Sequence, residues 1–204
     1  MTTVLLVARA SHPNHPRRGR MLTDVLRGAL STVVRGDPRD RLAERVALHL
    51  RERLPDDHIV LSRYAPRDRG ERIPVVVVGR ERIFVIELRD DAGALACYQD
   101  HWYRRTGTSR THPLGDSPSL RARRDVGRVR SDLGTGGYMN VPIDALVVLT
   151  RARAEDVGSS CVPVIAGLDA LIDRITRAAD GTPSPERTHA LAEALATNIK
   201  LATV

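Results

Sequence analysis

Cysteine, aromatic residues and long apolar runs are scarce in this chain of 204 residues. Its two cysteines, Cys97 and Cys161, have neither metal-ligand spacing nor the density of a secreted disulfide scaffold, and we expect buried free thiols. Aromatics make up 3% of the residues, which disfavours a protein that stacks single-stranded bases on Phe, Tyr and Trp. No stretch reaches the roughly 18 apolar residues of a spanning helix, so we expect no membrane contact and a cytoplasmic location.

Lysine is almost absent as well, because Lys200 is the only one among 32 Lys and Arg residues. The formal net charge is nevertheless +7 and the pI is near 10.3, which favours polyanionic partners. An arginine at a position where lysine would be expected is therefore explained by composition as readily as by loss of function.

Hydrophobic patterning predicts one α/β domain at 38–178, in which a mixed sheet is flanked by helices. Within it we expect a helix at 40–54, a strand at 58–64 and a hairpin at 73–89. A second small hairpin, an Arg-rich helix, strands near 143–149 and 162–165 and a helix near 168–178 follow. Residues 1–37 form an N-terminal appendage with a helix at 21–34, and 179–204 form a linker and an amphipathic C-terminal helix.

The most informative segment is the hairpin IPVVVVGRERIFVIELR, whose second strand ends with Glu87 and Arg89. Residues two apart in a strand leave the sheet on the same side, so a carboxylate and a cation share one small space. A carboxylate of this kind can hold Mg²⁺, and a neighbouring cation can position water at a phosphate. The competing interpretation is a charged pair at the point where a buried strand returns to solvent.

The order of these parts resembles the nuclease-related domain (NERD) family, a branch of the PD-(D/E)XK restriction-endonuclease-like superfamily. The resemblance includes DRLAERVALHLRERL, HIVLSRY, the hairpin, LACYQDHWYRR and IDALVVLT. In that family the second hairpin strand ends in Glu-x-Lys, a Gly follows, and a Trp closes the next hairpin. This chain keeps Glu87, Gly93 and Trp102. The resemblance implies a Mg²⁺-dependent nuclease site with Glu87 as metal ligand.

Two departures from the family pattern and one open register concern the active-site residues. The family's Asp at the start of the first hairpin strand aligns with Pro74, which has no ligand atom. Its Lys is replaced by Arg89, which cannot act as a general base but can hold a phosphate. The Glu that the family carries on its helix aligns with either Ala43 or Glu44, and the sequence does not decide between these two registers. A second carboxylate would then come from Glu44 or from two acids in the preceding turn, Asp68 and Glu71.

The Arg-rich helix is the candidate nucleic-acid surface, because Arg121, Arg124 and Arg128 follow one helical face. The alternative is a solvated helix surface on which Asp125 and Asp132 supply local ion pairs.

Two functions follow from these observations. The first is a NERD-like protein that acts on or binds nucleic acid, DNA in preference to RNA, with weak or lost metal-dependent nuclease activity. The second is a catalytically inactive pseudo-nuclease that serves as a protein-interaction module. For a protein partner or a homodimer, the elements best suited are a sheet edge at the small hairpin and the terminal helix.

Overall fold

The structure is a computed structural model that describes residues 37–106, 110–178 and 184–201. The helix predicted at 21–34 lies outside these residues. The first described helix, α2 (Pro38–Arg53), begins where Asp37 accepts a hydrogen bond from the backbone nitrogen of Arg39 at 2.9 Å. Proline at the first helical position adds to this start signal, because its missing N–H is not needed there. The helix therefore begins two residues before the predicted start.

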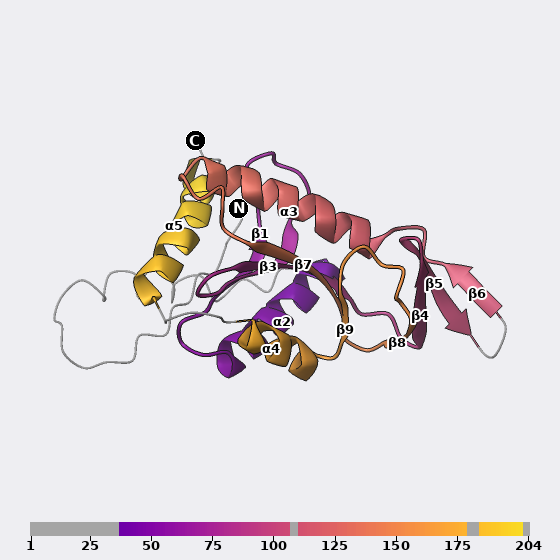
Figure 1. The fold of residues 1–204 in the computed structure, drawn as a ribbon. Helices are drawn as coiled ribbons and strands as arrows, with labels where there is room; N and C mark the ends of the chain where they lie inside the picture. Colours follow the sequence, from indigo (N-terminus) through magenta and orange to yellow (C-terminus); the bar gives the residue numbers. More distant parts are fainter. Residues whose placement is uncertain (1–36, 107–109, 179–183, 202–204) are drawn as a thin grey trace.

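A five-stranded mixed sheet forms the centre of the molecule (Figure 1). Its order is β1 (Ile59–Tyr64), β2 (Ile73–Val78), β3 (Ile83–Arg89), β7 (Ile143–Leu149) and β9 (Val164–Ala166). The first three strands are antiparallel neighbours, whereas β3–β7 and β7–β9 pair in parallel. The predicted strands at 143–149 and near 162–165 correspond to β7 and β9.

Helices cover both faces of this sheet, and each face has its own apolar core. On one face, α2 and α4 (Leu168–Arg177) pack against alternate side chains of β2 and β3. On the other face lie α3 (Pro118–Gly134) and α5 (Pro185–Leu201). The fully buried Leu191 and Leu195 show that α5 covers the core. The predicted fold class, a restriction-endonuclease-like mixed sheet flanked by helices, is confirmed.

A second, four-stranded sheet lies beside the first, at the right of Figure 1. Its order is β6 (Arg110–Pro113), β5 (His101–Thr106), β4 (Ala94–Tyr98) and β8 (Arg153–Asp156). The hairpin β4–β5 was predicted, but β6 and β8 were not. The buried Trp102 anchors this sheet, because its Nε1 donates to Ser119 Oγ at 3.0 Å. Cys97 is buried as expected, whereas the same expectation for Cys161 is wrong, because that residue is exposed.

Within the described ranges, no helix combines the length and apolar character needed to cross a membrane.

Candidate active site

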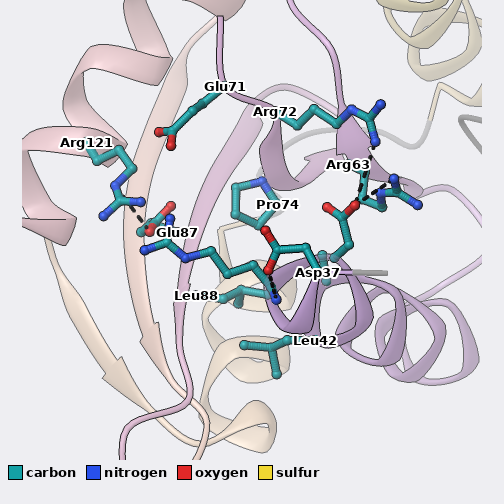
Figure 2. Close-up of a pocket in the computed structure, with 12 residues that line it drawn as sticks. Asp37, Leu42, Arg63, Glu71, Arg72, Pro74, Glu87, Leu88 and Arg121 are labelled. Carbon is teal, nitrogen blue, oxygen red and sulfur yellow. Dashed lines mark hydrogen bonds and ion pairs between the residues drawn. The ribbon is translucent and has the colours of Figure 1, made fainter. Parts of the chain in front are cut away.

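A cavity of about 230 Å³ lies where β2 begins and β3 ends, between the N-terminal part of α2 and helix α3. Glu87 of β3, Pro74 of β2 and Arg121 of α3 all line it. Figure 2 shows Arg121 reaching Glu87, with the Pro74 ring between Glu87 and Arg63. Two strands of one hairpin and a helix that follows much later in the chain therefore meet at Glu87.

Pro74 occupies a special position in the sheet. The antiparallel register Val75↔Ile86 places it opposite Glu87 when continued by one residue. On the β1 side, its partner position is Arg63, which lies between the pairs Ser62↔Val75 and Tyr64↔Ile73. Proline has no N–H to donate to a neighbouring strand, and Arg63 adopts a left-handed conformation with φ 55°. The local irregularity leaves a pyrrolidine ring, which has no ligand atom, facing the Glu87 carboxylate.

Glu87 is buried, with 5% of its surface exposed. Burial raises the pKa of its carboxyl to about 7, and the charge of Asp125 acts in the same direction. Arg121 opposes this rise, with its Nε 3.5 Å from Glu87 Oε1. Near neutral pH, Glu87 is therefore only partly ionised, and its nearest cation is already a protein side chain.

Arg89 projects from the same side of β3 as Glu87 but is held by other partners. Its Nε donates to Asp91 at 2.8 Å and its Nη1 to Asp116 at 3.0 Å. Arg121 also bonds Asp116, so the two arginines share this carboxylate. Asp116 was not predicted as a site residue, although its place just before the helix start Ser-Pro was a usable signal.

The structure settles which residue of α2 faces the site. Ala43 lines the cavity, whereas Glu44 does not and instead accepts a hydrogen bond from Arg63 at 2.9 Å. One helical turn earlier, Asp40 also lines the cavity. It lies 2.7 Å from Arg63 and 3.7 Å from Arg72, so it too is paired. Asp40 was missed, although its spacing of three from Ala43 places both residues on one helix face.

The two acids of the preceding turn have different positions. Asp68 lies outside the cavity lining and bonds Arg128 at 2.7 Å, and this hydrogen bond lowers the pKa of its carboxyl to about 2. Glu71 lines the cavity and lies 3.7 Å from Arg124. Of these two candidates, only Glu71 faces the same space as Glu87.

The three arginines of α3 that were predicted to form a nucleic-acid surface also differ in accessibility. Arg128 is nearly buried, with 10% of its side chain exposed, and it bonds Asp125 at 2.9 Å in addition to Asp68. Arg121 is similarly enclosed beside Glu87, with 14% exposed. Arg124 has 59% of its side chain exposed. Of these three arginines, Arg124 is the one with a largely exposed side chain.

The charges around the cavity leave little attraction for a divalent cation. Four acids and four arginines line it, namely Asp37, Asp40, Glu71, Glu87, Arg39, Arg63, Arg72 and Arg121. Protonation of Glu87 makes the set positive. Among the described residues, no group of three or more His, Cys, Asp or Glu side chains could hold a metal ion. The residues present therefore do not fit the Mg²⁺ that the family resemblance implies.

Comparison with known proteins gave one family assignment. Neither the curated proteins nor the solved structures yielded a match. The family model described as "Nuclease-related domain" (NERD) matches residues 39–150, a range that holds α2, the Glu87 hairpin, the Trp102 hairpin, α3 and β7. The match covers more than half of the chain, and its core elements are those that build the cavity. The chain belongs to the nuclease-related domain family.

Proposed function

We propose that this protein binds nucleic acid through its phosphates at the Glu87 cavity and that its metal-dependent phosphodiesterase activity is weak or lost. The observation that carries the proposal is the environment of Glu87. The carboxylate faces Pro74 across the hairpin and Arg121 across the cavity, where a metal site needs a second acid.

Family membership and charge support a nucleic-acid ligand. Nuclease-related domains are named for chemistry on nucleic acids, and the chain has a formal net charge of +7. Arginine suits phosphate because its planar guanidinium offers five N–H donors in a fixed geometry. The exposed side chains of Arg39 and Arg124 are the most accessible cations around the site. We favour DNA over RNA as the partner.

The reduced activity follows from the chemistry of the ligands. Mg²⁺ binds ionised carboxylates, with water and substrate phosphate completing an octahedral shell. Burial raises the pKa of Glu87 to about 7, which favours its protonated form over that of an ordinary carboxyl, and Asp40 is paired with arginines. To bind here, a metal ion would have to displace Arg121 from Glu87 and remove the Glu87 proton. Pro74 would supply no second ligand. Arg89 remains a phosphate ligand in this proposal, because a guanidinium does not deprotonate to serve as a base.

The alternative is a pseudo-nuclease that serves as a protein-interaction module. The edges of the second sheet favour it, since β6 and β8 are its terminal strands. Edge strands present unpaired backbone groups to which another chain can add. Tyr98, on the neighbouring β4, is 64% exposed. A homodimer formed through this sheet is one form of the same alternative.

One experiment separates these functions. Labelled single- and double-stranded DNA and RNA are titrated with the wild-type chain and with Glu87→Gln, with Mg²⁺, with Mn²⁺ and without metal. Binding and cleavage are scored in the same samples. We expect salt-sensitive binding by both proteins with little or no cleavage. Metal-dependent cleavage that disappears in Glu87→Gln would establish an active nuclease instead. Absence of any binding would favour the protein-interaction module.

A further inference from the structure

A second, wider cavity of about 880 Å³ adjoins the Glu87 cavity. The two share Arg39, Glu71 and Arg121 in their linings, while Glu87 belongs only to the first. Arg89 and Arg124 also line the second cavity, together with the turn that precedes α3. A ligand in the second cavity would therefore lie beside Glu87, separated from it by the Arg121 side chain.

We infer that this second cavity holds the terminal phosphate of a nucleotide strand, a phosphomonoester, next to the Glu87 site. Among the described residues that line this cavity, four arginines outnumber two carboxylates, those of Glu71 and Asp116, while Asp91 binds Arg89 and Asp125 approaches Arg124 from outside the lining. A phosphomonoester carries nearly two negative charges near neutral pH, whereas a backbone diester carries one. The inference rests on the proposed function, because it identifies which part of a nucleic acid the site would recognise.

Two of the arginines are held in fixed positions. The bonds from Arg89 to Asp91 and Asp116 use its Nε and Nη1, which leaves the Nη2 donors for a ligand. Arg121 uses Nη2 on Asp116 and turns Nε toward Glu87, which leaves Nη1. Both side chains are mostly enclosed, with 13% and 14% exposed. Donors that are already ordered lose little conformational entropy when a phosphate binds.

The other two arginines, Arg39 and Arg124, are exposed. The nearest carboxylate oxygens to Arg124 belong to Glu71 at 3.7 Å and Asp125 at 3.8 Å, longer than charge-assisted hydrogen bonds. In the part of the chain that the structure describes, we find no hydrogen bond or ion pair of the Arg39 guanidinium. Exposed pairs of this kind contribute little to stability, so these side chains can turn onto a phosphate at little cost.

The remaining lining suits the rest of a nucleotide. Leu114 and Leu120 contribute apolar surface, and Leu120 is 51% exposed. A ribose or a base can cover this surface while the phosphate meets the arginines. The N-terminus of α3, capped by Ser117, lies at the same cavity and adds its positive dipole end.

The experiment compares oligonucleotides of one sequence that carry a 5′-phosphate, a 3′-phosphate or no terminal phosphate, in competition against a labelled strand. Adenosine monophosphate and adenosine are tested in the same way, which separates a strand end from a free nucleotide. We expect a terminal phosphate to raise affinity about tenfold or more, as charged hydrogen bonds do. The double variant Arg39→Ala/Arg124→Ala should lose this preference. The control Arg123→Ala removes an exposed arginine of α3 that does not line the cavity. This variant should keep the preference for a terminal phosphate.

The outcomes for the two proposals are distinguishable. Equal affinity with and without a terminal phosphate, while oligonucleotides still bind, would overturn the phosphomonoester site and leave the proposed function standing. Retention of the preference by Arg39→Ala/Arg124→Ala would also overturn it. Arginine-dependent binding of adenosine monophosphate without binding of any oligonucleotide would overturn both nucleic-acid binding and the strand end as the ligand, and would leave a free nucleotide as the occupant.

Discussion

Glu87→Gln should make the protein more stable at alkaline pH and leave it almost unchanged at acidic pH. Burial raises the Glu87 pKa to about 7 from an ordinary value of 4.5, so between these values the folded chain binds this proton more tightly than the unfolded chain. The free energy of unfolding therefore falls as pH rises through this window. The full shift corresponds to about 3 kcal/mol, and about 2–3 kcal/mol of it is lost between about pH 5 and about pH 8. Glutamine has the shape of glutamate and carries no charge, so the variant does not lose this stability as pH rises.

Urea denaturation at the two pH values measures this difference, with the fluorescence of Trp102, the only tryptophan, as the signal. Glu52→Gln is the control, because Glu52 is an exposed carboxylate of α2 far along the helix from the cavity. We expect the Glu87→Gln advantage to grow with pH and the Glu52→Gln difference to stay nearly constant. Parallel pH curves for wild type and Glu87→Gln would show that Glu87 is ionised throughout and refute its assignment as a destabilised buried acid.

Three further predictions concern other parts of the site and its support. Tyr64→Phe should cost about 1–3 kcal/mol of unfolding free energy, because the buried Tyr64 hydroxyl donates to the Asp132 carboxylate at 2.6 Å; calorimetry would detect it, and an unchanged melting temperature would contradict it. Arg121→Gln should raise the pKa of Glu87 further by removing its nearest cation, so that in denaturation curves the loss of stability continues to higher pH while its onset stays the same. Arg124→Ala should weaken oligonucleotide binding and reduce its slope against log salt by about 1, whereas an unchanged slope would exclude a phosphate contact.

Local pattern was sufficient for the elements that bury a periodic apolar face. The β-branched runs of β2 and β3 and the apolar residues of α2, which recur every three or four positions, depend on neighbours in the sequence, and the boundaries of these elements agree with the prediction within a few residues. Strand β8 shows the limit of this reasoning. All four of its residues are exposed and none is large and apolar, so it forms because β4 offers a parallel edge, not because of its own pattern. Strand β6 is short and ends in a proline.

The composition of the site depended on long-range packing that periodicity does not encode. The same-side placement of Glu87 and Arg89 follows from strand geometry alone. Glu87 and Arg121 lie 34 positions apart in the sequence, and their contact requires the position of α3 over β3. Asp40 faces the cavity and Glu44 does not, because of the rotation of α2 about its own axis. Such a rotation of one residue is set by how Ala43 and Val46 pack on the sheet.

The binding of Mn²⁺ to the wild-type chain and to Pro74→Asp, measured without nucleic acid by electron paramagnetic resonance of the free ion, tests the central claim most directly. The claim is that Pro74 and Arg121 stand where a metal site needs ligands. It predicts weak binding by the wild type and about tenfold tighter binding by Pro74→Asp, since the new carboxylate faces Glu87 across the hairpin. Tight binding by the wild type that Glu87→Gln abolishes would contradict it.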